Sequence, residues 1–267
     1  MPEPNVGTSG TPRGSVGMRR SFPVAGGYRL SSWSTGSTAV TPVVCVHGAG
    51  TSSRPLLPLV ERLGRSVETW AVDLPGFGQS SRPAEPLGLT ALGETLADWL
   101  EAVELPPACL LGSSFGCQVV TEVAVRHPDR VRSLVLVGPT TDPAARTWPR
   151  TVLRWLRDSV RESPRMLPLK LADYRDCGAG GVLFAFGESL RDRIEDRLPA
   201  VTVPTLVVRG ERDTVVSHSW AEEVTRLVPG ARLATVPNSP HMVPFREPEA
   251  LAALVTEFVR QDADADG

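Results

Sequence analysis

Two adjacent serines, Ser113 and Ser114, lie between two glycines in the stretch CLLGSSFGCQVV at residues 109–120. The stretch contains the pattern G-x-S-x-G, with Ser114 at its centre and Gly112 and Gly116 on either side. One apolar run enters the pattern and another leaves it, which is typical of a buried strand that turns sharply into a helix. A serine at such a turn projects its hydroxyl above a sheet, and the glycines avoid collisions of a Cβ atom with nearby backbone. The pattern therefore indicates Ser114, rather than Ser113, as a candidate nucleophile.

A general base must accompany this serine, because a hydroxyl is a poor nucleophile at neutral pH. The chain has four histidines. His241 lies in the loop PNSPHMVPF, directly after the last expected strand, where its ring can reach the carboxyl edge of a parallel sheet. His127 and His218 lie at helix ends, and His47 in HGAG is expected to hold its loop by hydrogen bonding. His241 is therefore the candidate base.

A carboxylate is needed to orient the imidazole and to stabilise the imidazolium that forms in the reaction. Asp213 lies in RGERDTVV, just past an expected strand. Asp142, just past the preceding expected strand, and Glu211 are the alternatives. We favour Asp213, because its short side chain suits a turn directly beyond its strand.

Acyl transfer also requires N–H donors for the oxyanion of the tetrahedral intermediate. The backbone amide of Phe115, directly after the candidate nucleophile, is the first candidate donor. The second is the amide of Ala49 in HGAGTSS, where small residues let the backbone approach the site, and Gly50 is the alternative.

The elements that must position these residues alternate along the chain. Apolar, β-branched runs predict strands over residues 28–34, 42–47, 67–73, 108–113, 131–138, 205–210 and 231–237. Helical spacing of apolar residues predicts helices over 53–64, 89–105, 115–128 and 217–228, and one within 245–260. This alternation predicts an α/β fold with a mainly parallel sheet and helices on both faces. Functional groups of such folds collect beyond the carboxyl ends of the strands.

Residues 139–199 interrupt the alternation, since they are arginine-rich, helical in pattern and too long for a bare loop. We expect them to form a helical cap inserted between two core segments, residues 18–138 and 200–262. Residues 1–17 are rich in Gly, Pro, Ser and Thr and are predicted to be a disordered tail.

The cap is expected to carry the information about the substrate. One helical stripe holds four arginines: Arg150, Arg154, Arg157 and Arg161. A different face holds four apolar residues: Val152, Trp155, Leu156 and Val160. This pattern predicts an amphipathic helix with a solvated basic face, and the alternative is that one arginine enters the pocket to bind a carboxylate. The candidates for the apolar lining of the pocket are Phe184, Phe186, Met242 and Trp155.

Composition argues against several other classes of protein. The net charge of −2 over 267 residues gives no electrostatic reason to bind nucleic acid or an anionic membrane. No apolar run approaches the roughly 20 residues that span a bilayer, and residues 1–17 do not resemble a secretory signal. The four cysteines form no CxxC pair and no metal-type cluster with histidine, so we expect buried thiols, no metal site and a reducing, cytoplasmic location.

Five motifs occur in a fixed order: VVCVHGAG, AVDLPGFGQSSRP, LLGSSFGCQVV, LVVRGERD and NSPHMVPFREPE. With them the chain resembles the α/β-hydrolase fold family from about residue 28 to residue 260. The resemblance implies an eight-stranded sheet, a cap after the sixth strand, and a triad of Ser114, Asp213 and His241 in that chain order. It also implies no metal and no organic cofactor. Cys117, where many relatives have a second glycine, is small enough for the turn.

The first functional hypothesis is a serine hydrolase that cleaves a small or medium ester, thioester or lactone through an acyl-enzyme intermediate. The alternative keeps the fold and the triad but changes the reaction to carbon–carbon bond hydrolysis, a lyase or synthase reaction, or perhydrolysis. A third hypothesis is a non-enzymatic small-molecule receptor, against which the complete triad argues. The expected partner is a small-molecule acyl substrate, and the oligomeric state stays open.

Overall fold

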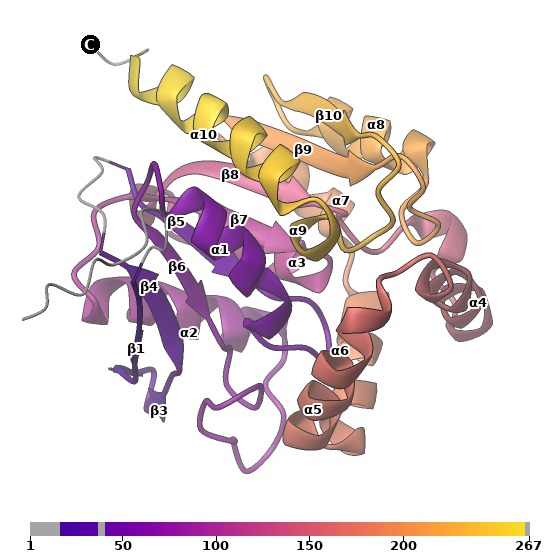
Figure 1. The fold of residues 1–267 in the computed structure, drawn as a ribbon, viewed down its shortest axis with the longest axis horizontal. Helices are drawn as coiled ribbons and strands as arrows, with labels where there is room; N and C mark the ends of the chain where they lie inside the picture. Colours follow the sequence, from indigo (N-terminus) through magenta and orange to yellow (C-terminus); the bar gives the residue numbers. More distant parts are fainter. Residues whose placement is uncertain (1–16, 37–40, 265–267) are drawn as a thin grey trace, which may run out of the picture.

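The computed structural model describes residues 17–36 and 41–264 (Figure 1). An eight-stranded sheet is formed by β1 (Met18–Ser21), β4 (Ser32–Thr35), β5 (Val43–Val46), β6 (Thr69–Val72), β7 (Ala108–Ser113), β8 (Val131–Val137), β9 (Thr205–Gly210) and β10 (Arg232–Val236). A separate two-stranded hairpin is formed by β2 (Val24–Ala25) and β3 (Tyr28–Arg29). The predicted disordered tail lies outside the described residues, except for Gly17.

The order of strands across the sheet is β1-β4-β6-β5-β7-β8-β9-β10. The pairs β1–β4 and β4–β6 are antiparallel, and all the later pairs are parallel. Every residue of β5, β7 and β9 is buried, as expected for parallel strands covered by helices on both faces. The predicted α/β fold with a mainly parallel, eight-stranded sheet is confirmed.

The N-terminal end of the sheet differs from the expectation. The single strand predicted over residues 28–34 is divided, because β3 ends at Arg29 and β4 begins at Ser32, with the buried Leu30 between them. The edge strand β1 was not predicted at all. Its sequence MRRS lacks apolar alternation, and its conformation is set by antiparallel pairing with β4, in which Met18 lies opposite Thr35. Two arginines on this exposed edge also disfavour pairing with another chain.

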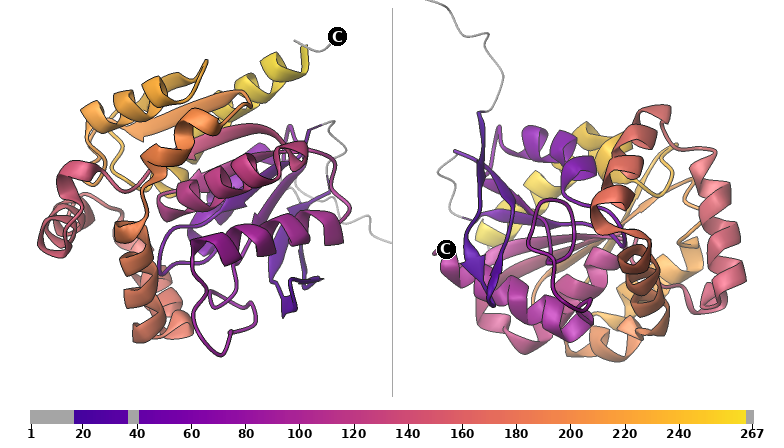
Figure 2. Two further views of the ribbon diagram at one scale, coloured as in Figure 1. Left: turned by 180° about the vertical axis from the view of Figure 1, so that it is seen from behind. Right: turned by 90° about the horizontal axis from the view of Figure 1, so that it is seen from below.

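Helices cover both faces of the sheet (Figures 1 and 2). One face packs against α1 (Leu57–Leu63), α9 (Val243–Arg246) and α10 (Pro248–Asp264), and the other against α2 (Leu89–Ala102), α3 (Phe115–Arg126) and α8 (His218–Leu227). Alternate residues of each strand enter opposite cores. In β7, Cys109 and Leu111 pack in the core on the α1 and α10 face, whereas Leu110 packs in the core on the α2 and α3 face.

The segment between β8 and β9 contains α4 (Trp148–Ser159), α5 (Leu167–Cys177), α6 (Ala179–Arg191) and α7 (Ile194–Arg197). All residues from 139 to 204 are described, and none of them is in a strand. Helices α4, α5 and α6 lie to one side of the sheet in Figure 1 and cover residues that follow the ends of several strands, whereas α7 contacts α3. We call residues 139–199 the cap, with the bounds expected from the sequence.

Helix α4 is oriented differently from the sequence prediction. The apolar residues Val152, Leu156 and Val160 are 45%, 53% and 87% exposed, whereas Asp158 is only 3% exposed. Arg154 is not part of a solvated basic face, because its guanidinium pairs with the buried carboxylate of Asp142. The helix turns a polar stripe inward because buried polar groups under the cap need partners, which apolar periodicity alone does not reveal.

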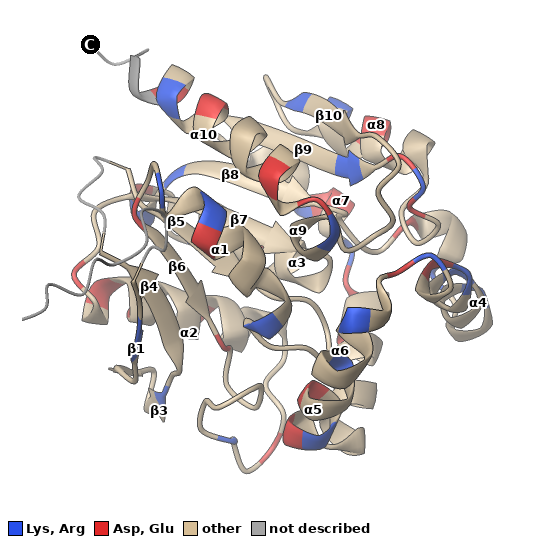
Figure 3. Ribbon diagram, viewed as in Figure 1, with Lys and Arg blue, Asp and Glu red and all other residues tan. Residues whose placement is uncertain are grey.

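Acidic and basic residues are interspersed over the described part of the chain (Figure 3). None of the described helices is long and apolar enough to span a bilayer. The four cysteines are buried and unpaired.

Candidate active site

Ser114 occupies the sharp turn between β7 and α3. Its φ of 56° and ψ of −120° lie in a region that non-glycine residues rarely adopt, a strain that costs about 1–3 kcal/mol and is found mainly at functional sites. The flanking glycines are required by close backbone approach. A Cβ atom on Gly112 would lie 2.5 Å from the amide nitrogen of Cys117, and one on Gly116 would lie 2.4 Å from the carbonyl oxygen of Val46. The Cys117 side chain itself fits the turn, with Sγ 3.1 Å from the Gly112 oxygen.

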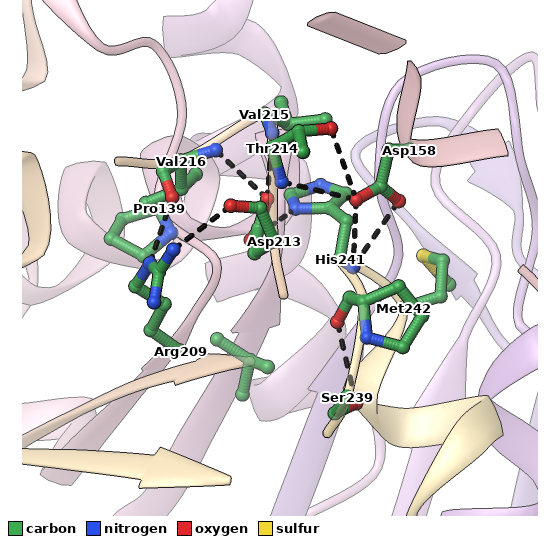
Figure 4. A network of polar contacts seen from close by, with 12 residues as sticks. Pro139, Asp158, Arg209, Asp213, Thr214, Val215, Val216, Ser239, His241 and Met242 are labelled. Carbon is green, nitrogen blue, oxygen red and sulfur yellow. Dashed lines mark hydrogen bonds and ion pairs between the residues drawn. The ribbon is translucent and has the colours of Figure 1, made fainter. Parts of the chain in front are cut away.

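A histidine and an aspartate meet beyond the ends of β9 and β10 (Figure 4). Nδ1 of His241 lies 2.8 Å from Oδ2 of Asp213, and both residues are almost fully buried. The other oxygen of Asp213 accepts hydrogen bonds from the backbone amides of Val215 at 2.7 Å and Val216 at 2.9 Å. The carboxylate is therefore fixed at both oxygens, and its bond to Nδ1 leaves Nε2 of the imidazole for chemistry.

A buried arginine on β9 holds the loop that carries Asp213. Arg209 on β9 donates to the carbonyl oxygens of Val216 and Asp213, each at 2.9 Å. The imidazole ring of His241 rests on the end of β8, where a Cβ atom on Gly138 would lie 2.9 Å from Cε1. A glycine at this position is thus what lets the ring reach its place above the sheet.

The two alternative acids have other partners. Asp142 accepts from the Ala144 amide and from Ser217 Oγ, both at 2.8 Å, and forms the ion pair with Arg154. Glu211 accepts from the amide of Asn238 at 2.8 Å. Among the acidic side chains of the described residues, the one that contacts a ring nitrogen of His241 is Asp213.

A cavity of about 70 Å³ brings these groups together. Ser114 and His241 both line it, with Gly48 and Ala49 from the loop after β5 and several residues of the cap. This loop passes directly over the serine, since a Cβ atom on Gly48 would lie 3.2 Å from Ser114 Cβ. The chain thus encloses the hydroxyl, the imidazole and the candidate oxyanion loop in one small space.

The loop over the serine is held by a buried histidine. Nδ1 of His47 lies 2.9 Å from the Gly48 oxygen, and its Nε2 accepts from the Leu74 amide at 3.1 Å. These bonds fit a neutral imidazole, and burial lowers the pKa of His47. The amides of Ala49 and Phe115 donate no hydrogen bond to any other described residue. Both amides are therefore free to receive an oxyanion.

Three of the four expected pocket residues line this cavity: Trp155, Phe186 and Met242. Phe184 does not, and its assignment to this pocket is corrected. It lines a neighbouring cavity of about 240 Å³, together with the side chain of Phe115. The reason is that residues 184 and 186 lie on one helix, α6, where a separation of two residues turns side chains to nearly opposite faces.

The cavity also has a polar wall that the sequence analysis did not identify. Asp158 near the end of α4, Glu162 in the turn that follows it and Lys170 on α5 contribute to it. Two signals were available in the sequence: Lys170 is the only lysine of the chain, and the two acidic residues are four positions apart, beside the stripe of arginines. Arg154 also lines the cavity, but its charge is already compensated by Asp142.

The pKa of the His241 imidazole is higher than the ordinary value of a histidine. Burial alone would lower the pKa of His241, but the charge of Asp213 and its hydrogen bond, followed by the charges of Asp158 and Glu162, raise it to about 9. The neutral form that can accept a proton therefore becomes more abundant as the pH rises.

The described residues contain no group of three or more His, Cys, Asp and Glu side chains that could hold a metal ion. Burial raises the pKa of the thiols of Cys45, Cys109 and Cys117. These cysteines therefore supply neither a disulfide nor an accessible thiolate.

Known proteins share both this sequence pattern and this architecture. The model of the Alpha/beta hydrolase family matches residues 43–254. A pimeloyl-[acyl-carrier protein] methyl ester esterase of Neisseria meningitidis is 29% identical over 246 residues, which cover 83% of this chain and 94% of that protein. A 2-hydroxymuconate semialdehyde hydrolase of Pseudomonas putida is 28% identical over 270 residues, which cover 91% of this chain and 94% of that protein.

Solved structures show the same fold. The crystal structure of a membrane phospholipase A matches with a TM-score of 0.80 at 24% identity, covering 92% of this chain and 87% of that one. The family match spans the core from β5 to α10 and includes the turn at Ser114 and the loops at Asp213 and His241. The chain therefore belongs to the alpha/beta hydrolase family and is a hydrolase enzyme.

Proposed function

We propose that this hydrolase cleaves a small or medium carboxylic ester, thioester or lactone through an acyl-enzyme on Ser114. The observation that carries the proposal is the buried Asp213–His241 pair, whose imidazole lines the same cavity as a serine in strained backbone geometry. The similarity to an enzyme named as a methyl ester esterase supports an ester as the substrate.

In the first half of the reaction, Ser114 Oγ attacks the carbonyl carbon while Nε2 of His241 takes the hydroxyl proton. Asp213 stabilises the imidazolium through its hydrogen bond to Nδ1. The oxyanion receives hydrogen bonds from the amides of Phe115 and Ala49. The tetrahedral intermediate then collapses, the bond to the leaving group breaks, and the imidazolium gives its proton to the departing oxygen or sulfur.

In the second half, a water molecule enters from the side that the leaving group has vacated. His241 takes a proton from this water as the oxygen attacks the acyl carbon. Collapse of the second tetrahedral intermediate breaks the bond to Ser114 Oγ and returns the proton to the serine. The products are the free acid and the regenerated enzyme.

The size of the cavity limits the acyl group. A cavity of about 70 Å³ is smaller than the roughly 150 Å³ cavities that accept benzene. We therefore expect p-nitrophenyl acetate and butyrate to be hydrolysed at least about tenfold faster, in kcat/KM, than the decanoate. Equal values for acetate and decanoate would contradict a pocket of this size.

The second candidate is a carbon–carbon bond hydrolase that uses the same three residues. The polar wall formed by Asp158, Glu162 and Lys170 and the similarity to an enzyme named as a semialdehyde hydrolase favour it. Side-by-side assays with p-nitrophenyl esters and a vinylogous diketone separate the two. Faster turnover of the diketone would favour this candidate over the esterase.

Labelling with a fluorophosphonate probe tests the nucleophile directly. The wild-type protein should be labelled on Ser114 with loss of esterase activity, and Ser114→Ala should be neither labelled nor active. Ser113→Ala is the matched control, because Ser113 is the neighbouring serine, is 2% exposed and ends β7. Labelling of Ser114→Ala with retained turnover would overturn the proposal, and ligand binding without turnover in the wild type would indicate a receptor.

A further inference from the structure

Asp158 connects the cap to both loops that carry the proposed base and acid. Its Oδ1 accepts from the backbone amides of Thr214 and His241, each at 3.2 Å, and its Oδ2 also lies 3.2 Å from the His241 amide. Thr214 is the residue after Asp213, and its hydroxyl also donates to the carbonyl of Arg154 on α4 at 3.0 Å. Figure 4 shows His241 between Asp213 on one side and Asp158 on the other.

Glu162 extends this contact by one residue along the histidine loop. Its Oε1 accepts from the amide of Met242 at 2.9 Å. Its Oε2 is buried and accepts from no donor among the described residues. The carboxyl groups of Glu162 and Asp158 lie close enough for a hydrogen bond, which requires one proton between them.

The charges around this pair favour that protonation state. Burial raises the pKa of Glu162 most, the Met242 amide lowers it, and the charge of Asp158 and its hydrogen bond raise it further, to about 7 overall. The other charged groups that face the pair are Lys170 on α5 and His241 after β10, and His241 is itself paired with Asp213. The nearby Arg154 is paired with Asp142.

We infer that Asp158 and Glu162 are positioning residues, through which docking of the cap holds the Asp213 and His241 loops in the geometry that the base requires. The role of these residues in catalysis rests on the proposed function. The hydrogen bonds from which the role is inferred do not depend on that function. Three backbone amides, those of Thr214, His241 and Met242, donate to Asp158 near the end of α4 and to Glu162 in the turn that follows it. Neither carboxyl contacts the Ser114 hydroxyl, so both residues act through the loops that they hold.

The first test measures the pKa of His241 by NMR titration of the imidazole resonances, assigned with His241→Gln. Asp158→Asn removes a neighbouring negative charge and should lower this pKa by about one unit, which raises the neutral fraction at pH 7 about tenfold. Asp158→Leu, which removes the acceptor for the Thr214 and His241 amides, should slow fluorophosphonate labelling about tenfold at pH 10, where His241 is mostly neutral.

A pair of variants at Glu162 separates positioning from a general effect on folding. Glu162→Gln keeps an acceptor for the Met242 amide and a donor for Asp158, so it should label within about twofold of wild type. Glu162→Leu loses both and should label at least about tenfold more slowly. Asp176→Asn is the control for cap stability, since Asp176 ties α5 to Arg54 away from this site, and it should leave the pKa of His241 unchanged.

An unchanged His241 pKa in Asp158→Asn, or equal labelling of the Gln and Leu variants at position 162, would overturn the inference. If Asp158→Asn does not fold, the labelling rates of Glu162→Gln and Glu162→Leu decide whether the inference holds. If wild-type Ser114 resists the probe, the proposed function fails, and the NMR titration still decides whether the cap residues set the state of His241.

Discussion

The substitution Gly116→Ala tests whether the turn at Ser114 depends on close backbone packing. A Cβ atom on residue 116 would lie 2.4 Å from the oxygen of Val46 and 2.7 Å from that of His47, whereas ordinary contact begins at 3.4 Å. The start of α3 and the end of β5 must therefore separate by about 1 Å. These two segments carry the amides of Phe115 and Ala49, which are the proposed oxyanion donors.

A displacement of about 1 Å at catalytic groups lowers activity about 100-fold, so we expect kcat/KM of Gly116→Ala to fall by about that factor. Overpacking should also lower the free energy of unfolding by about 1–3 kcal/mol, partly offset by the better helix propensity of alanine. The assays are hydrolysis of p-nitrophenyl butyrate and urea unfolding of the same preparation.

Gly180→Ala is the matched control, because it makes the same change in α6, where a Cβ atom meets nothing within 4 Å. It should keep kcat/KM within about twofold and stabilise the protein by up to about 1 kcal/mol. If Gly116→Ala behaves like this control in both assays, the turn tolerates a side chain and the reasoning from backbone contact is refuted.

Three further predictions concern the groups that titrate in the site. Asp213→Asn should lower kcat by about 10³- to 10⁴-fold with little change in KM, because the amide favours the wrong tautomer of His241; a loss below tenfold in steady-state assays would argue against this role. The logarithm of kcat/KM should rise with pH through an apparent pKa of about 9, because only neutral His241 accepts a proton, and a profile that is already flat above pH 7 would contradict the raised pKa. Glu162 holds its proton in the folded state up to a pKa of about 7, above the ordinary 4.5, so its contribution to stability is full below pH 4.5 and is lost as the pH rises to 7. Urea unfolding between these values should show a decrease of at most about 3 kcal/mol that is absent in Glu162→Gln, and identical slopes for the two proteins would refute it.

The core of the fold was predictable because local patterns and tertiary structure agree there. Buried strands such as β5 and β7 are continuous apolar runs, and helices such as α2 and α3 repeat apolar residues at helical spacing. The strand β1 was missed because a charged edge strand is specified by its partner rather than by its own sequence.

The positions of Ser114, Asp213 and His241 followed from the rule that functional groups collect beyond strand ends. No such rule gives the orientation of the helices in the cap. Which face of α4 is buried depends on carboxyl groups that meet the backbone at Thr214 and His241, distant in sequence. Phe184 lies two residues before Phe186 on α6, so its side chain turns to nearly the opposite face and lines the neighbouring cavity. Cytoplasmic location stays a prediction.

Trapping the covalent intermediate tests the central claim most directly. The enzyme is mixed with p-nitrophenyl butyrate, whose good leaving group favours acylation over deacylation, and is quenched in acid within milliseconds. Mass spectrometry of the peptide that contains residues 109–120 should show one butyryl group, localised by fragmentation to Ser114, and no such adduct in Ser114→Ala. Turnover with no acyl adduct under these conditions, or an adduct on any other residue, would contradict nucleophilic catalysis by Ser114.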